Sequence, residues 1–210
     1  MRFLIQKIKI KLTIFWEKIN NQDFSTITPI SDIGVEKDLQ EKIHHGSNSC
    51  GKHLKNVFSF MRVDCNDSIL DVGSAKGGAI NCMRRFPFKK IAGVEISYSL
   101  YRVSIKNFKK YYDLRIELFN CDARNFEEYS RFNMFYLYNP FNEEILEEVI
   151  KKIKNSISKD REIFIIYNLP RYHNILLNYG FFKLKEFPAM WGNKIFLYSN
   201  SDNPSRILKS

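Results

Sequence analysis

The chain has 210 residues, of which 44% are hydrophobic and 27% are charged; it can bury a sizeable core and is too apolar to be a disordered chain. Lysines and arginines outnumber aspartates and glutamates by 33 to 23, a surplus that favours anionic partners unless it only solvates the surface. Neither a zinc site nor a disulfide framework is expected, because no C-x-x-C pair and no histidine at ligand spacing occurs among the four cysteines, Cys50, Cys65, Cys82 and Cys121.

The first 20 residues alternate apolar and basic side chains. Basic residues interrupt the apolar ones at Arg2, Lys7, Lys9, Lys11 and Lys18. These charges argue against a bilayer-spanning run of about 20 apolar residues. No small-residue cleavage site follows, which argues against a signal peptide. We expect residues 1–21 to form a basic amphipathic extension, either packed on its own domain or lying on a membrane or a partner.

Residues 22–66 are expected to form a linker and a helical cap. Thr, Pro, Ser, Asp and Gly break any periodicity over residues 22–34. Helices are predicted at 36–43 and 51–61, separated by a polar loop at 44–49. One face of the second helix carries the apolar residues Leu54, Val57, Phe58 and Met61.

From residue 67 to the end, apolar strands alternate with helices, and we assign 67–210 to one domain. Strands are predicted at 68–72, 90–95, 115–119, 132–138 and 162–167. Helices are predicted at 77–85, 97–110, 143–156 and 171–179. The last two strands, 181–187 and 194–199, are joined by a connection too short for a crossover helix, so they should pair antiparallel. This order predicts an α/β fold with a mostly parallel sheet between helices.

The first of these strands runs into a glycine-rich turn, Asp71-Val72-Gly73-Ser74-Ala75-Lys76-Gly77-Gly78. Gly73 and Gly77 allow the chain to turn sharply. The helix that follows presents unpaired backbone N–H groups at its start. Glu95 ends the next strand, near the spacing expected of a carboxylate that holds ribose hydroxyls. The pattern therefore predicts a site for a nucleotide-like cofactor.

Two cofactors compete for this loop. Gly73-x-Ala75-x-x-Gly78 loosely fits the dinucleotide fingerprint. Asp71-x-Gly73-x-Ala75-x-Gly77 fits a loop that binds S-adenosylmethionine (SAM), in which Asp71 would suit the cationic amino group of the methionine. Next to a diphosphate the same carboxylate would be unfavourable, because like charges repel in a partly desolvated site. The charge therefore favours SAM over NAD(P).

Polar residues also end the third and fourth strands. Asp122, in Asn120-Cys121-Asp122-Ala123, can accept a hydrogen bond from an adenine amino group or can cap a turn. In Tyr138-Asn139-Pro140-Phe141, the Asn139 carboxamide can accept a hydrogen bond from a substrate amine and Phe141 can stack on a flat substrate. The alternative for this motif is a strand end followed by a helix cap.

Four segments together resemble motifs of the class I SAM-dependent methyltransferases: Asp71–Gly77, Val94–Ser97, Cys121–Ala123 and Asn139–Phe141. The resemblance covers about residues 67–199, and Phe86–Ser97 is its most specific part, similar to small bacterial members. It implies a Rossmann-like, doubly wound, seven-stranded sheet with an antiparallel C-terminal strand and helices on both faces. Ala75 and the single proline Pro140 depart from the family pattern, and the single proline argues against an adenine or glutamine acceptor.

The resemblance also implies roles for individual residues. SAM would contact Asp71, Gly73, Ser74, Ala75, Gly77, Glu95, Ile96, Asp122, Ala123 and Asn139. The methyl acceptor would contact Asn139, Pro140 and Phe141. Residues around His45–Leu54 would help to cover the cofactor.

The sequence leaves the catalytic group and the acceptor open. SAM is already activated by its positive charge, so a general base is needed only for a hydroxyl or a protonated amine. The candidate catalytic residues are Asn139, His45 and His173. We expect a methyltransferase acting on a small or glycan-like metabolite or on a macromolecule. The alternatives are a non-catalytic SAM-binding module with a basic surface for nucleic acid or membrane, and an NAD(P)-dependent oxidoreductase.

Scattered cysteines favour a reducing, cytoplasmic location. No metal is expected. Peripheral membrane contact through residues 1–20 stays open, as does a nucleic-acid partner.

Overall fold

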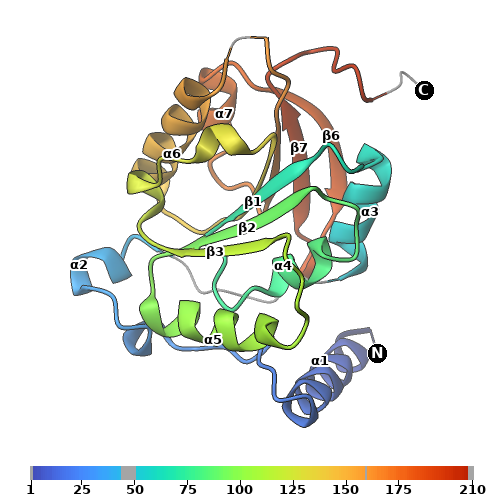
Figure 1. The fold of residues 1–210 in the computed structure, drawn as a ribbon, viewed down its shortest axis with the longest axis vertical. Coiled ribbons are helices and arrows are strands. Elements are labelled where there is room, and N and C mark those ends of the chain that lie inside the picture. The colour runs from blue at the N-terminus through green and yellow to red at the C-terminus, as the bar shows by residue number, and fades with distance from the viewer. Residues whose placement is uncertain (1, 44–50, 159, 208–210) are drawn as a thin grey trace.

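The computed structural model describes residues 2–43, 51–158 and 160–207 and contains one seven-stranded sheet in the order β3-β2-β1-β4-β5-β7-β6 (Figure 1). The strands are β1 (Ser68–Val72), β2 (Lys90–Glu95), β3 (Ile116–Asn120), β4 (Met134–Tyr138), β5 (Phe164–Asn168), β6 (Phe182–Pro188) and β7 (Lys194–Ser199). β1 pairs in parallel with β2 and with β4, and β7 runs antiparallel to both of its neighbours, β5 and β6. The predicted α/β fold with its antiparallel C-terminal strand is confirmed.

Seven α-helices occur in the described part of the chain. They are α1 (Arg2–Ile19), α2 (Lys37–Gln40), α3 (Lys52–Met61), α4 (Gly78–Met83), α5 (Tyr98–Lys109), α6 (Glu143–Ser156) and α7 (His173–Asn178). Ser97 caps α5, since its hydroxyl accepts a hydrogen bond from the Leu100 N–H at 3.2 Å. In the same way, Asn142 caps α6 through the Ile145 N–H at 3.1 Å.

Apolar side chains cover both faces of the sheet, as expected for parallel strands between helices. Every residue of β1 is buried. On one face, the predicted apolar stripe of α3 packs with Ile69 and Met134. On the other face, α6 packs with Leu70 and Phe135. Because β1 is buried on both sides, the position of the loop that follows this strand is fixed relative to the sheet.

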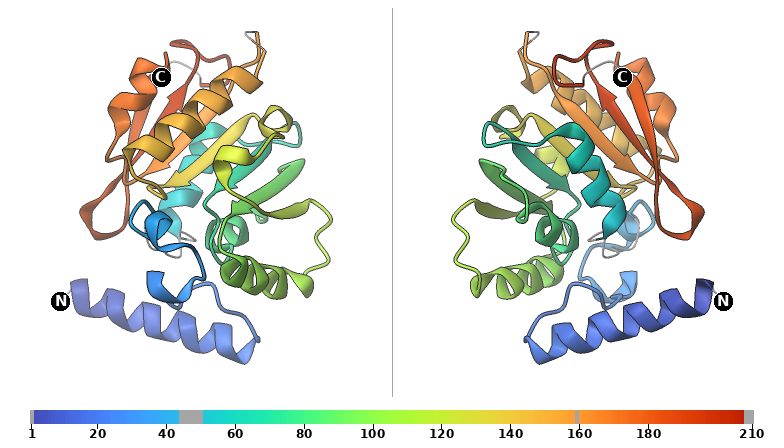
Figure 2. Two further views of the ribbon diagram at one scale, coloured as in Figure 1. Left: turned by 90° about the vertical axis from the view of Figure 1, so that its left-hand side faces the viewer. Right: turned by 90° about the vertical axis from the view of Figure 1, so that its right-hand side faces the viewer.

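The segment between α1 and α3 is not a free linker. Phe24 and Ile33 within it are only 4% and 5% exposed, because they join the body of the protein. By contrast, α1 lies at one end of the molecule, away from the sheet (Figure 2). Its apolar side chains at Ile8, Leu12, Phe15, Trp16 and Ile19 are 50% to 61% exposed. No described helix is both long and apolar enough to cross a membrane.

β6 forms one edge of the sheet. Its pairing with β7 is irregular between Lys183 and Lys185, and both lysines are exposed. The strand ends at Pro188, a residue that cannot donate a backbone hydrogen bond.

Candidate functional site

A cavity opens at the carboxyl ends of β1, β2 and β4, where the order of the strands reverses direction along the chain. Open α/β sheets bind ligands at such a switch point. The cavity has a volume of about 1090 Å³, which includes space open to solvent. Its walls come from the β1–α4 loop, from the ends of β2 and β4, and from the segment that follows α1.

The β1–α4 loop turns tightly against its neighbours. The N–H groups of Gly73 and Ser74 both donate to the Val94 carbonyl, at 3.0 and 2.9 Å. Gly73 has φ +79°, and a Cβ built on it would lie 2.7 Å from Pro140 Cβ. Gly77 has φ +83°, and its Cβ would lie 2.8 Å from the Ser104 hydroxyl. Both positions therefore require glycine.

Asp71 places a buried carboxylate at the base of the cavity. Its side chain is 3% exposed, and within the described part of the chain it forms no hydrogen bond or ion pair. Burial, together with the charge of the nearby Glu95, raises the pKa of Asp71 well above its usual range. An isolated buried carboxylate of this kind is stabilised by a cationic ligand.

Glu95 has a double role in the geometry of the site. One carboxylate oxygen accepts the Ala75 N–H and the other the Ser97 N–H, both at 2.8 Å. Burial raises the pKa of Glu95, and these backbone hydrogen bonds offset part of that rise. A carboxylate has about four acceptor positions. Glu95 can therefore hold the loop and still accept hydrogen bonds from a diol in the cavity.

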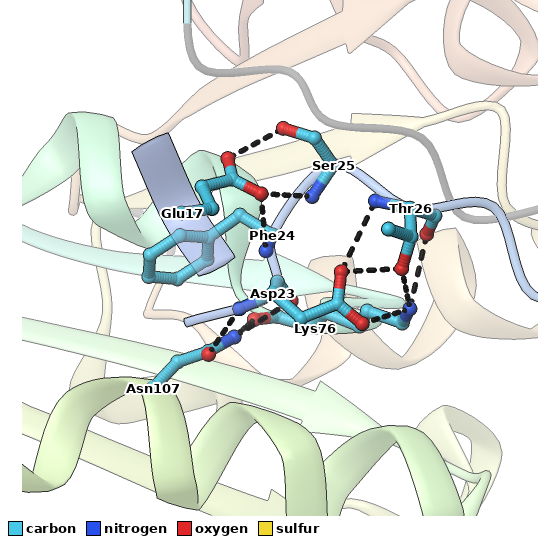
Figure 3. Close-up of polar contacts among 7 residues, drawn as sticks. All are labelled: Glu17, Asp23, Phe24, Ser25, Thr26, Lys76 and Asn107. Atoms are coloured by element: carbon cyan, nitrogen blue, oxygen red, sulfur yellow. Dashed lines mark hydrogen bonds and ion pairs between the residues drawn. The ribbon is translucent and has the colours of Figure 1, made fainter. Parts of the chain in front are cut away.

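The charge of the cavity is negative on balance. Among the described residues that line it, Lys76 is the only lysine or arginine. Its ammonium is bound by Asp23 and Thr26 (Figure 3). Asp122 forms an ion pair with Arg124 at 2.7 Å, which leaves Asp71 and Glu95 as the uncompensated charges. These two acceptor carboxylates fit a ligand with a cationic group and a diol, and the described lining residues offer no free basic partner to a diphosphate.

Most of the predicted cofactor residues line the cavity. They are Asp71, Gly73, Ser74, Ala75, Glu95, Ile96, Asp122 and Ala123. Gly77 does not line it, because it packs against Ser104 and Phe108. Asn139 does not line it either, because its carboxamide oxygen accepts the Tyr167 hydroxyl at 3.2 Å in a site that is 2% exposed.

The predicted substrate and catalytic residues are only partly brought together. Pro140 and Phe141 line the cavity. His173 lies outside the lining, with its ring edge-on to Phe196 at 5.7 Å. His45 lies outside the described residues. Asp122 also caps a turn, as the alternative interpretation predicted, since its carboxylate accepts a hydrogen bond from the Arg124 N–H at 2.8 Å. No group of three or more metal-ligating side chains occurs within the described residues.

The N-terminal segment supplies a wall that we did not predict. The residues that contribute are Phe24, Thr26, Thr28, Ile30, Ile33, Leu39 and Ile43. Ile43 also pairs with Phe141 in an isolated antiparallel bridge. Of the cover that we expected at His45–Leu54, residues 45–50 lie outside the described part of the chain, and Leu54 is buried against the sheet. The apolar residues at 24, 30 and 33 were the available signal, hidden among turn-forming residues.

Comparisons with known proteins find similarity in the fold. No family model and no curated protein matches the sequence. An RNA methyltransferase from Salinibacter ruber, solved with S-adenosylhomocysteine (SAH), has a TM-score of 0.54 and 16% identity over 74% of this chain and 95% of its own. A proposed RNA methyltransferase from Pyrococcus horikoshii has a TM-score of 0.57 and 16% identity over 83% and 94% of the two chains.

A ribosomal protein L11 methylase from Lactobacillus delbrueckii subsp. bulgaricus is similar to a comparable degree. Its TM-score is 0.58, with 16% identity over 75% of this chain and 80% of its own. At such low identity the likeness concerns the fold. The chain has the fold of the class I SAM-dependent methyltransferases, as the sequence motifs predicted.

Proposed function

We propose that this protein is a SAM-dependent methyltransferase and that SAM occupies the cavity at the ends of β1, β2 and β4. The observation that carries the proposal is Asp71, a buried carboxylate without a described hydrogen-bonding partner, in the same cavity as Glu95. The fold supports it, because proteins that share this fold include a methyltransferase solved with SAH. When bound, SAM would supply a methyl group on a positively charged sulfonium.

In this proposal each wall of the cavity recognises one part of SAM. Asp71 balances the ammonium of the methionine moiety, and Glu95 accepts hydrogen bonds from the ribose hydroxyls. Asp122, Ala123 and Ile96 border the adenine. Burial strengthens the attraction between Asp71 and a cation, because the local dielectric is low.

The acceptor side of the site is proposed to be the wall formed by Tyr138, Pro140 and Phe141. Asn139 shapes this wall through its bond to Tyr167 and does not present its carboxamide oxygen to the acceptor. Proteins with this fold act, by their descriptions, on RNA and on a ribosomal protein. A macromolecular acceptor is therefore proposed beside a small or glycan-like metabolite.

The test is thermal unfolding of the purified protein with candidate cofactors. SAH or SAM at about 100 times its dissociation constant should stabilise the protein by about 2.7 kcal/mol, a melting temperature rise of roughly 5–10 °C. NAD⁺ and NADH should give no rise, because the described residues that line the cavity offer no free basic partner to their diphosphate. Asp71→Asn and Glu95→Gln should reduce the rise, whereas Glu127→Gln, at an exposed carboxylate, should keep it. A rise with NAD(H) alone would favour the oxidoreductase and overturn the proposal.

Methyl transfer separates the enzyme from a non-catalytic SAM-binding module. The protein is incubated with methyl-labelled SAM and with RNA, protein and small-metabolite fractions of a cell extract. Label in one fraction, lost in Asp71→Asn, identifies the acceptor class. Binding of SAH without label in any fraction would instead support the non-catalytic module.

We further propose that α1 contacts an anionic membrane surface. Ile8, Leu12, Phe15 and Ile19 recur at helical spacing and share one exposed face. Lys7, Lys11 and Lys18 recur in the same way along one border of that face. The only carboxylate of α1, Glu17, is turned inward and accepts the N–H groups of Phe24 and Ser25 at 3.0 and 2.9 Å.

This combination of an apolar face and a basic border suits the interface of an anionic bilayer. A second copy of α1 is a poorer partner, because it would oppose lysines to lysines with no carboxylate to offset them.

A further inference from the structure

Lys76 lies in the middle of the proposed cofactor loop, yet its ammonium serves another segment. The residue is 7% exposed. Its three N–H groups have three acceptors: Asp23 Oδ2 at 2.7 Å, the Thr26 carbonyl at 3.0 Å and the Thr26 hydroxyl at 2.7 Å (Figure 3). A lysine has no further donors. The loop is thus bound by its own side chain to residues 50 and more positions earlier in the chain.

Asp23 and Thr26 form a turn around this ammonium. The second carboxylate oxygen of Asp23 accepts the Thr26 N–H at 3.1 Å and also the Thr26 hydroxyl. Burial tends to raise the pKa of Asp23, but the hydrogen bonds from Lys76 and Thr26 outweigh burial, and the pKa is lowered. Asp23 is therefore ionised near neutral pH, and the contact with Lys76 is an ion pair.

Asn107 is a fully buried residue of α5, and its side chain binds backbone groups of the same turn. Its carboxamide oxygen accepts the Asp23 N–H at 2.8 Å. Its amide nitrogen donates to the carbonyls of Asp23 and Lys76, at 2.9 and 3.0 Å. A single side chain thus ties the helix, the loop and the N-terminal segment together.

Residues 22–33, which we call the strap, are anchored at their far end as well. The hydroxyls of Ser97 and Ser99 donate to the Ile33 carbonyl at 2.5 and 3.1 Å. Ser97 itself donates its N–H to Glu95. Between the two anchors, Thr26, Thr28 and Ile30 line the cavity. Each anchor is next to a proposed cofactor contact, Lys76 next to Ala75 and Ser97 next to Ile96.

We propose that Lys76 and Asp23 are positioning residues for the cofactor, because their ion pair locks the strap onto the β1–α4 loop as the outer wall of the cavity. The proposal rests on the proposed function. The side chains of the pair are 9% and 35% exposed, so the contact is partly shielded from water and stronger than a surface pair. A cofactor held behind the closed strap leaves only when the strap opens.

The pair also neutralises a charge beside the site. Without Asp23, Lys76 would be an unpaired buried cation next to a cavity that we propose receives a cation. Removal of Asp23 alone should therefore weaken binding more than removal of both partners. This order of affinities follows from the charges of the pair. A residue that only supports the fold would not produce it.

The experiment measures the affinity and the dissociation rate of labelled SAH in the full-length protein and its variants. We expect Lys76→Met to release SAH at least tenfold faster, Asp23→Asn to bind it more weakly than Asp23→Asn/Lys76→Met, and Lys76→Arg to restore part of the affinity. Thr26→Val, which removes one of three acceptors, should give a smaller change in the same direction. The control is Lys42→Met, which breaks an exposed ion pair with Glu144 at 2.9 Å and should leave dissociation unchanged.

The outcomes separate the two proposals. If the unmodified protein does not bind SAH, the proposed function fails. If it binds SAH and the Lys76 and Asp23 variants release it at the unmodified rate, the function stands and the positioning role is overturned. If Lys76→Met does not fold, Asp23→Asn, Lys76→Arg and Thr26→Val decide, and affinities and dissociation rates equal to those of the unmodified protein in all three would overturn the role.

Discussion

Ala75 is a residue under local strain at the centre of the cofactor loop. Its φ of +46° lies in the left-handed region that favours glycine. The conformation persists because the Ala75 N–H donates to Glu95 at 2.8 Å, which fixes the turn. A side chain in this region costs about 1–2 kcal/mol, offset in part by the greater freedom of glycine in the unfolded chain.

Ala75→Gly should therefore raise the free energy of unfolding by up to about 1 kcal/mol. Thermal or chemical denaturation of the protein without cofactor measures this. Ala92→Gly, in the buried strand β2, is the control with the opposite sign, because it removes a packed methyl group and adds backbone freedom. Equal losses in both variants would contradict the strain at Ala75.

The raised pKa of Asp71 gives a second expectation, now for stability against pH. Its carboxylate is disfavoured in the folded state by burial and by Glu95. Stability from this group is therefore complete below the ordinary carboxyl pKa, about 4, and is lost as the pH rises through the raised folded value.

Asp71→Asn, which cannot ionise, should make the cofactor-free protein more stable than the unmodified chain at neutral pH and equally stable near pH 4. Urea unfolding across this pH range measures the difference. Glu127→Gln, at an exposed carboxylate, should show no such trend. A destabilised Asp71→Asn at neutral pH would contradict the assignment of Asp71 as a buried carboxylate with no partner among the described residues.

At the scale of elements, the sequence was sufficient to predict the strands of the sheet and the helices that flank it. It was insufficient to predict the ordered structure of the strap. β1, β2, β7 and α6 begin and end as predicted. α7 begins two residues later than predicted, because Leu169 takes a left-handed conformation and the Arg171 N–H closes a turn onto it. The strap was predicted as a linker, since its order depends on Lys76 and Asn107, which are distant in sequence.

α1 is the element whose surroundings are most readily tested. We expect the full-length protein to sediment with vesicles that contain phosphatidylserine and much less with phosphatidylcholine alone, because α1 combines an apolar face with lysines. Leu12→Ser/Phe15→Ser should lose this binding. Leu114→Ser/Leu177→Ser alters two other exposed leucines, 97% and 42% exposed, and should keep it. Equal binding by both double variants would refute the contact through α1.

At the scale of the whole molecule, the sequence predicted the class of fold from the alternation of strands and helices. It also predicted that the last two strands pair antiparallel. It did not predict that β7 inserts between β5 and β6. The composition explains that position: Leu197 and Tyr198 of β7 are fully buried, whereas most of β6 is exposed. The more apolar strand takes the interior of the sheet.

Of the candidate site, the sequence predicted the parts that follow directly from strand ends. Asp71, Glu95 and Asp122 come together because parallel strands place their carboxyl ends at one edge. The engagement of Asn139 by Tyr167 joins β4 to β5 through side chains, and no sequence pattern encodes such a contact. The same holds for the ion pair of Lys76 with Asp23.

The position of β6 has a consequence for how copies of this protein behave in a crowded solution. An unpaired edge strand is a template on which another chain can add its own strand and begin a growing aggregate. Here the edge carries Lys183 and Lys185 at an irregular step and ends in Pro188. Charge, a bend and a missing donor each oppose the docking of a foreign strand on this edge of the sheet.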